Sequence, residues 1–410
     1  MQIKIKAPAH LSTNVKLPSS KSICNRALIL HALAGGNTKI HNLSDCDDTQ
    51  VMVKGLRTRG ETINIMAAGT AMRFLTAFFS VQEGETHLLT GTKRMQQRPI
   101  RILVDALRSL GANIEYAGEE GYPPLRIHGC KLTGKETSLP GNVSSQYISA
   151  LLMTGTMLPQ GLTLHLTGDI ISRPYIDLTL QLMADFGAQA QWNSDQKSIR
   201  IEPQQPKPQT YTVESDWSAA SYWYEMAALS QEAYITLPGL KPNSYQGDSA
   251  VGRLFEGLGV RTVFDEKGVT LERIPRTIER MEYDFINQPD LAQTLVVTCA
   301  LLNIPFRFSG LQSLKIKETD RMAALIHELK KLGYVLHEAD QSVLFWNGER
   351  AAPEEHPTID TYEDHRMAMA FAPAALCLTE LHINNPEVVS KSYPHYWEDL
   401  HRAGFQIEES

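Results

Sequence analysis

The chain has 410 residues, which at about 100–200 residues per domain suggests two domains, or three. Hydrophobic residues make up 42% and charged residues 21%, a composition that excludes a disordered or fibrous chain. The net charge is −7, so the chain lacks the overall basic surface of a nonspecific nucleic-acid binder, and no nucleic-acid partner is expected. If the ligand is an anion, cations must be gathered locally.

The sequence also argues against a membrane protein and a disulfide scaffold. No apolar stretch reaches the roughly 18 residues that would span a bilayer, and residues 1–6 alternate like a strand rather than a signal peptide. The five cysteines are scattered and contain no CxxC pair. We therefore expect reduced thiols, a cytoplasmic location, no zinc site and no membrane partner.

Two helix types alternate along the chain. One type is apolar nearly all round, which predicts burial, and the other is amphipathic and closes on a glycine, which predicts a left-handed helix cap. The predicted buried helices are 21–34, 68–80, 144–157, 217–229, 291–302 and 366–378. The closing glycines are Gly60, Gly111, Gly187, Gly259, Gly333 and Gly404, spaced 51, 76, 72, 74 and 71 residues apart.

This spacing predicts six copies of a unit of about 72 residues, each with one buried helix, one amphipathic helix and several short strands. The first interval is about twenty residues short, so a hairpin or strand pair is missing there. The predicted class is α/β, with two domains of three units each. An unrelated run of α/β segments is the alternative.

Polar residues gather at the starts of these helices, where unpaired N–H groups and the helix dipole favour anions. In the first half of the chain, Lys21, Ser22 and Arg26 lie in the first turns of the first buried helix. Gly69 opens the second, and a small-residue turn lets a ligand approach the backbone. The other such residues are Arg73, Arg98, Ser144, Ser145, Gln146, Ser172 and Tyr175.

The second half has the same arrangement. Asp290 opens the fifth buried helix, and Lys317, Glu318 and Arg321 form the densest charge cluster. Each segment alone could be ordinary helix capping, a solvated cation or a surface ion pair. If the helix starts converge, the site gathers eight cations: Lys21, Arg26, Arg73, Arg98, Lys317, Arg321, Arg366 and Lys391. No P-loop, GxGxxG or metal-ligand spacing occurs, so no nucleotide, metal or other cofactor is expected.

The motifs resemble those of the 5-enolpyruvylshikimate-3-phosphate synthases, which are enolpyruvyl transferases. The matching stretches run in the family's order over nearly the whole chain: LPSSKSICNRALIL (17–30), AGTAMR (68–73), RMQQRPI (94–100), YPPLRI (122–127), VSSQY (143–147), SRPYID (172–177), NSYQGD (243–248), KETDRM (317–322) and DHRMAM (364–369).

The resemblance implies a fold of two domains, each of three βαβαββ units with buried parallel helices and outer sheets. The arrangement is that of an inside-out α/β barrel with pseudo-threefold symmetry. It places residues 1–18 and 216–410 in one discontinuous domain and residues 19–215 in the other. It implies an active site in the cleft between the domains.

The resemblance further implies transfer of the enolpyruvyl group of phosphoenolpyruvate to the 5-hydroxyl of shikimate 3-phosphate, through a tetrahedral intermediate, in the shikimate pathway. The implied catalytic residues are Asp290 as base for the 5-hydroxyl, Glu318 as proton carrier at C3 of phosphoenolpyruvate, and Lys21 between the substrates. The implied shikimate 3-phosphate ligands are Lys21, Ser22, Arg26, Ser144, Ser145, Gln146, Ser172, Tyr175, Asp290, Ser313 and Lys317. The implied phosphoenolpyruvate ligands are Lys21, Gly69, Arg98, Gln146, Arg321, Arg366 and Lys391.

The chain departs from the family pattern at three positions. Ala67 and Ser313 replace asparagines, and Phe74 replaces a common proline. We expect altered affinity for phosphoenolpyruvate and altered sensitivity to glyphosate, an inhibitor of the family. A monomer is expected. The alternatives are a UDP-N-acetylglucosamine enolpyruvyl transferase, whose loop cysteine has no counterpart between Cys46 and Cys130, and a non-catalytic anion-binding protein.

Overall fold

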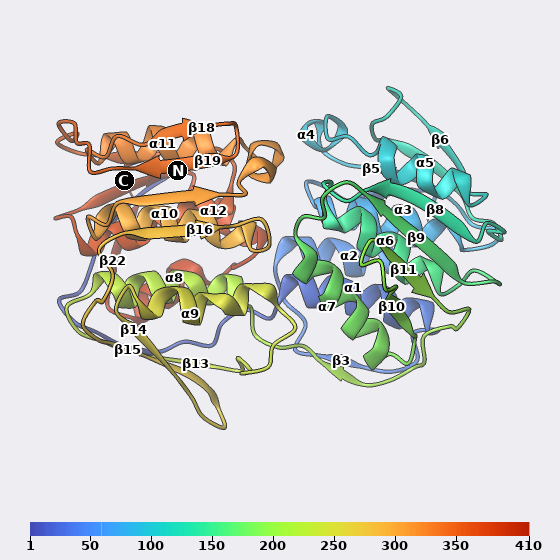
Figure 1. Cartoon of the computed structure of the whole chain (residues 1–410), viewed down its shortest axis with the longest axis horizontal. Helices are drawn as coiled ribbons and strands as arrows, with labels where there is room; N and C mark the ends of the chain where they lie inside the picture. The colour runs from blue at the N-terminus through green and yellow to red at the C-terminus, as the bar shows by residue number, and fades with distance from the viewer. Residues whose placement is uncertain (59, 410) are drawn as a thin grey trace. The chain divides into compact units, whose positions relative to one another are not determined.

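The computed structural model describes residues 1–58 and 60–409. The chain forms two compact units (Figure 1). The terminal unit holds Met1–Ser20 and Glu214–Ser410, and the central unit holds Lys21–Val213. The chain passes between units two residues from each domain boundary expected from the sequence, 18/19 and 215/216. The expected boundaries remain a prediction, and Ser410 in the expected range 216–410 lies outside the described residues.

The central unit contains two complete copies of a strand–helix–strand–helix–strand–strand repeat. In each copy the first two strands pair in parallel, and the remaining pairs of the four-stranded sheet are antiparallel. One copy is β4 (Thr62–Asn64), α3 (Gly69–Ser80), β5 (Thr86–Thr90), the short α4 (Lys93–Gln96), α5 (Arg101–Ser109), β6 (Asn113–Tyr116) and β7 (Leu125–His128). The other is β8 (Glu136–Pro140), α6 (Ser145–Gly155), β9 (Leu162–Thr167), α7 (Arg173–Asp185), β10 (Ala190–Trp192) and β11 (Ser198–Ile201).

The remaining repeat of the central unit is shorter. It contains α1 (Lys21–Leu33), β3 (Ile40–His41), α2 (Asp47–Arg57) and β12 (Tyr211–Thr212), and within the described residues its sheet consists of the two strands β12 and β3. This is the repeat for which the glycine spacing predicted a missing strand pair, and the two-stranded sheet confirms that prediction.

The terminal unit has three four-stranded sheets with the same strand order. Its first repeat is β2 (Leu11–Asn14), α8 (Trp217–Leu229), β13 (Ala233–Pro238), η1 (Gly247–Ala250), α9 (Val251–Glu256), β14 (Val260–Phe264) and β15 (Gly268–Arg273). The second is β16 (Met281–Asp284), η2 (Pro289–Leu291), α10 (Ala292–Leu301), β17 (Phe306–Ser309), η3 (Gln312–Ile316), α11 (Arg321–Lys331), β18 (His337–Ala339) and β19 (Val343–Trp346). The third is β20 (Thr358–Ile359), α12 (His365–Phe371), η4 (Ala372–Leu376), β21 (Leu381–Asn384), η5 (Pro386–Lys391), α13 (Tyr396–Arg402), β22 (Gln406–Glu409) and β1 (Gln2–Lys6).

Strands distant in sequence complete two repeats at the crossovers. The early strand β2 pairs in parallel with β13 and so begins the repeat that contains α8. The late strand β12 pairs in parallel with β3 and so belongs to the repeat that contains α1. The strand β1 closes the last sheet between β21 and β22, which brings both chain termini into the terminal unit (Figure 1).

The predicted buried helices form the centre of each unit. Every residue of α3 and of α10 is buried, as their all-round apolar sequences predict. In the central unit α1, α3 and α6 pack against one another, and in the terminal unit α10 packs against both α8 and α12. The N-termini of these helices carry the polar residues that the sequence singled out.

Two local expectations were wrong. The helix predicted at 366–378 ends at Phe371 and continues as the 3-10 helix η4, because Pro373 has no N–H to donate. The helix α2 ends at Arg57 with Thr58 extended, so Gly60 does not directly cap it, and Arg59 lies outside the described residues.

The other five closing glycines have positive φ, as predicted for left-handed caps; they are Gly111, Gly187, Gly259, Gly333 and Gly404. Within residues 1–58 and 60–409, none of the helices combines the length and the apolar character needed to cross a membrane.

Candidate active site

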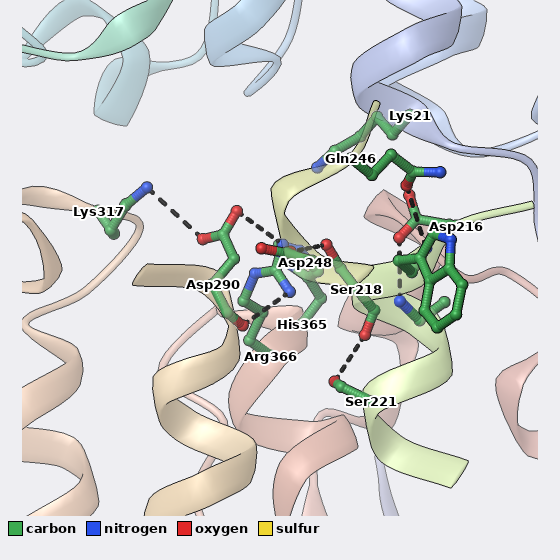
Figure 2. A network of polar contacts seen from close by, with 12 residues as sticks. Lys21, Asp216, Ser218, Ser221, Gln246, Asp248, Asp290, Lys317, His365 and Arg366 are labelled. Atoms are coloured by element: carbon green, nitrogen blue, oxygen red, sulfur yellow. Dashed lines mark hydrogen bonds and ion pairs between the residues drawn. The ribbon is translucent and has the colours of Figure 1, made fainter. Parts of the chain in front are cut away.

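A cluster of charged side chains lies at the helix starts of the terminal unit. Asp290, on η2 just before α10, has a side chain only 17% exposed. Its Oδ1 lies 3.6 Å from Lys317 Nζ, and its Oδ2 lies 3.0 Å from Arg366 Nη2 (Figure 2). Arg321 Nη1 is 3.4 Å from Oδ1. These three cations stabilise the negative charge of Asp290, and the carboxylate remains accessible enough to meet a ligand.

The second carboxylate of the cluster is Glu318, between η3 and α11. Its Oε1 accepts a hydrogen bond from Lys391 Nζ at 2.6 Å, and its Oε2 accepts one from Arg321 Nη2 at 2.9 Å. Glu318 and Asp290 therefore share Arg321 as a neighbour while each has cations of its own. The arrangement provides two distinct carboxylates in one strongly cationic environment, which suits acid–base chemistry on an anionic substrate.

Arg321 is the buried residue that connects the carboxylates of this cluster. Its guanidinium is 2% exposed and donates from Nε to Asp364 Oδ2 at 2.7 Å and from Nη2 to Asp364 Oδ1 at 3.2 Å. Burial alone would lower the pKa of Arg321, but Asp364 and then Glu318 raise it above its usual value. Asp364 also caps α12 by accepting from the Arg366 backbone N–H at 3.0 Å. The pair therefore fixes α11 against α12.

Burial also shapes the other cations. Desolvation lowers the pKa of Lys317, which Asp290 partly offsets. Arg366 Nη1 donates to the Tyr222 hydroxyl of α8 at 3.3 Å and to the Asp290 carbonyl at 3.4 Å. Burial raises the pKa of Tyr222 to about 12, so the phenol stays neutral and acts only as an orienting partner.

In the central unit, Lys21 begins α1 and pairs with a buried acid. Its Nζ lies 3.3 Å from Asp48 Oδ2, and the side chains are 18% and 6% exposed. Asp48 comes from the first turn of α2, where a carboxylate is stabilised by the helix dipole. The pair orients the Lys21 ammonium from the start of α1, and Ser22 follows it in the same turn.

Arg26 is bonded to the protein interior. Its Nε donates to Thr179 Oγ1 at 2.7 Å, its Nη2 to Ser149 Oγ at 2.9 Å and its Nη1 to the Ser22 carbonyl at 2.9 Å. Burial lowers its pKa to about 10, and the guanidinium lies 5.4 Å from the centre of the Phe74 ring. Arg26 therefore ties α1 to α6 and α7, and its implied role as a phosphate ligand remains a prediction.

Two implied phosphoenolpyruvate ligands lie together at the start of α3. A Cβ added to Gly69 would lie 2.7 Å from Arg98 Nη1, so the guanidinium rests on the glycine backbone. Gln146 reaches the same helix start from α6, with its Nε2 donating to Thr70 Oγ1 at 3.0 Å. An arginine, an amide and the helix N-terminus are the donors that a phosphate or carboxylate needs.

The remaining predicted residues also lie at helix starts. Ser144 is exposed and caps α6, and the next residue, Ser145, is buried. Ser172 precedes α7 in the left-handed conformation, with Tyr175 in the first turn of that helix. Ser313 is half-buried on η3 in the terminal unit.

Sequence reasoning missed several residues of these clusters. Asp48, Thr70 and Tyr222 contact predicted site residues but received no role. A carboxylate at the start of α2 was a visible signal for Asp48, whereas Tyr222 occurs within an apolar run with nothing to mark it. Among residues 1–58 and 60–409, no group of three or more His, Cys, Asp and Glu side chains could hold a metal ion.

A family model described as "EPSP synthase (3-phosphoshikimate 1-carboxyvinyltransferase)" matches residues 5–66 and 58–400. The chain belongs to this family. The resemblance inferred from the motifs is thereby confirmed, and so is the assignment to an enzyme family.

Two similar proteins match this chain over 95% or more of its length. A 3-phosphoshikimate 1-carboxyvinyltransferase of Bacteroides fragilis strain YCH46 is 61% identical over 100% of this chain and 99% of its own. One from Photobacterium damsela subsp. piscicida is 36% identical, covering 95% of this chain and 96% of its own.

Solved structures confirm the fold. An EPSP synthase structure from Acinetobacter baumannii has a TM-score of 0.77 at 20% identity, with 100% of both chains covered. The enolpyruvyl transferase NikO from Streptomyces tendae has a TM-score of 0.74 at 18% identity, covering 100% of this chain and 98% of that one.

Proposed function

We propose that this chain transfers the enolpyruvyl group of phosphoenolpyruvate to the 5-hydroxyl of shikimate 3-phosphate and releases phosphate. Family membership supports this reaction. The observation that carries it is the pair of carboxylates among four cations of the terminal unit, with Asp290 beside Lys317, Arg321 and Arg366, and Glu318 beside Arg321 and Lys391.

The two carboxylates divide the proton transfers. Glu318 gives a proton to C3 of phosphoenolpyruvate, which leaves C2 electron-poor. The 5-hydroxyl oxygen attacks C2 while Asp290 takes its proton, and a tetrahedral ketal phosphate results. The C2–O bond to phosphate then breaks, and the leaving phosphate takes up the proton that Asp290 received from the 5-hydroxyl. The C3 proton returns to Glu318, so that phosphate and the enol ether product form and both carboxylates are regenerated. Acid–base groups of this kind contribute about 10²–10⁴-fold each.

The cations bind the anionic groups. Arg98, Arg321, Arg366 and Lys391 bind phosphoenolpyruvate together with Gly69 and Gln146. Ser22, Arg26, Ser144, Ser145, Ser172, Tyr175, Ser313 and Lys317 bind shikimate 3-phosphate with Asp290 and Gln146. Lys21 contacts both substrates. The Lys21–Asp48 pair and the contact of Arg98 with Gly69 support these roles, because each presents a cation at a helix start.

The test is phosphate release from phosphoenolpyruvate, measured with shikimate 3-phosphate and, separately, with UDP-N-acetylglucosamine. Release only with shikimate 3-phosphate is expected. Release only with the nucleotide sugar would assign the chain to the other acceptor, and no release from folded protein with either acceptor would leave an anion-binding protein.

We also propose that the enzyme is a cytoplasmic monomer.

Gly69→Ala is expected to raise the KM for phosphoenolpyruvate about tenfold, with a smaller effect on shikimate 3-phosphate. The new methyl group would lie 2.7 Å from Arg98 Nη1, so this flexible side chain must move away from the start of α3. Steady-state kinetics would measure the change. Gly60→Ala is the matched control, because Gly60 has no positive φ and its added Cβ would meet only Thr58 Cγ2, at an ordinary 3.7 Å. An unchanged KM in Gly69→Ala would contradict the proposed role of Arg98.

Glyphosate is proposed to compete with phosphoenolpyruvate, and Ala67 to weaken its binding. Ala67 is exposed two residues before α3 and has no side-chain donor, where the family commonly has asparagine. Ala67→Asn is expected to lower the inhibition constant by up to about tenfold, the effect of one hydrogen bond to a charged ligand. Ala67→Leu adds similar bulk without a donor and is not expected to do so. Equal inhibition curves for both variants would contradict the proposal.

A further inference from the structure

A third carboxylate, Asp248, lies beside the cluster and has no role in the mechanism above. It belongs to η1, the 3-10 turn that leads into α9, and its side chain is 3% exposed. One oxygen, Oδ2, accepts a hydrogen bond from the Ser218 hydroxyl in the first turn of α8 (Figure 2). The other, Oδ1, has no hydrogen-bond partner among the described residues. A buried carboxylate with one unpaired oxygen is costly, whereas the neutral acid is tolerated.

The backbone around Asp248 is held firmly. Gln246, two residues earlier, accepts from the Trp217 backbone N–H at 3.1 Å and donates to the Ser215 carbonyl at 2.9 Å. Its Nε2 also donates to Glu214 Oε2 at 3.0 Å. Gln246 and Asp248 therefore both form hydrogen bonds with the start of α8 from the same turn. Asp248 cannot move to solvent without breaking these bonds.

Charged groups from three neighbouring elements act on Asp248. Asp216, which caps α8, and Asp290 on η2 oppose its ionisation, and Arg366 on α12 favours it. On β16, burial is the largest influence on the pKa of Tyr283 and raises it, whereas the charge of Arg253 of α9 lowers it and that of Asp248 raises it. His365, which follows Asp364 on α12, has its Nδ1 3.6 Å from the Asp364 carboxylate. Burial and then the charge of Asp290 raise the pKa of Asp248 to about 7.

We propose that Asp248 is a positioning residue that controls the binding of the anionic substrates through its own charge. When Asp248 is neutral, Arg366 contacts the carboxylate of Asp290 and can also bind phosphoenolpyruvate. When it is ionised, a second negative charge draws on Arg366 and repels phosphoenolpyruvate. The inference rests on the proposed function, and it extends the site to a residue outside the set that transfers protons or contacts substrate.

The sign of the pH effect follows from this coupling. The neutral form of Asp248 predominates below about pH 7 and is lost as pH rises. The KM for phosphoenolpyruvate is therefore expected to rise about tenfold between pH 6 and 8.5. The reason is that one negative charge added beside the cations of the site weakens the binding of an anion by about one power of ten. The effect on kcat is expected to be smaller, because Asp290 still has Lys317 beside it and Glu318 still has Lys391.

Asp248→Asn fixes the neutral form with an amide of the same shape. Because the phosphate of phosphoenolpyruvate itself titrates, the informative quantity is the ratio of the wild-type KM to the Asp248→Asn KM at each pH. This ratio is expected to rise about tenfold from pH 6 to 8.5. Asp216→Asn, which removes the other carboxylate at the start of α8, is the matched control and is expected to keep the rise.

Ser218→Ala provides a second, independent reading. The Ser218 hydroxyl lowers the pKa of Asp248, so its removal is expected to move the midpoint of the KM rise to higher pH. Parallel profiles of KM against pH for the wild type and Asp248→Asn would overturn the inference. If Asp248→Asn does not fold, an unchanged midpoint of the KM rise in Ser218→Ala would overturn it instead. Phosphate release with parallel profiles overturns this inference alone, whereas no release from the wild type overturns the proposed function and the inference with it.

Discussion

Replacement of Glu318 by glutamine is expected to lower kcat by about 10²–10⁴-fold while the protein still binds its substrates. The amide keeps the shape of the side chain, and its oxygen can still accept from Lys391 or Arg321, whose contacts with Glu318 are 2.6 and 2.9 Å. It cannot carry the proton to C3. Phosphate release gives kcat, and calorimetric titration with the substrates gives binding.

Glu338→Gln is the matched control for this variant. Glu338 pairs with Lys315 at 2.6 Å, the same distance as Glu318 and Lys391, but it lies on β18 away from the helix starts. Its replacement is expected to leave kcat within about twofold of the wild type, as for a pair worth no more than about 1 kcal/mol. Equal kcat values for Glu318→Gln and the wild type would remove Glu318 from the mechanism.

The repeat architecture was predictable because two independent signals had the same period. Glycines such as Gly187 and Gly259 recur where helices must end in the left-handed conformation, and buried helices such as 217–229 are apolar on every face. The strand exchange at the crossovers was not predictable from these signals. Strands as short as β12 and β3 have two residues each and carry no usable alternation.

The charged cluster of the terminal unit was partly predictable, since Asp290, Glu318 and Arg321 lie at helix starts or close together in sequence. What the sequence does not show is which partners they choose. Arg321 contacts Asp364, 43 residues later, and no local pattern marks this pair. Asp248 was visible within the NSYQGD motif, but its burial and unpaired oxygen depend on three elements meeting in space.

Arg321→Met is expected to abolish measurable turnover and to lower the free energy of unfolding by about 3–5 kcal/mol. Arg321 bonds to Asp364 and Glu318 and lies beside Asp290, so its removal takes one cation away from three carboxylates at once. The Asp364 side chain is fully buried, and an uncompensated buried charge is among the most destabilising changes in a protein. Urea unfolding would measure the loss, and phosphate release the activity.

The stability deficit of Arg321→Met should depend on pH in a definite direction. Without the guanidinium, Asp364 must carry an unpaired charge in the interior or take up a proton that the unfolded chain does not bind at neutral pH. Proton uptake by the folded variant becomes easier in acid, so the deficit relative to the wild type shrinks as pH falls from 7 towards about 4.5. Arg280→Met, which breaks an exposed pair with Glu282, should show a small deficit that does not vary in this way. A deficit in Arg321→Met that is constant with pH would mean that Arg321 stabilises the fold by packing its aliphatic stem rather than by neutralising Asp364.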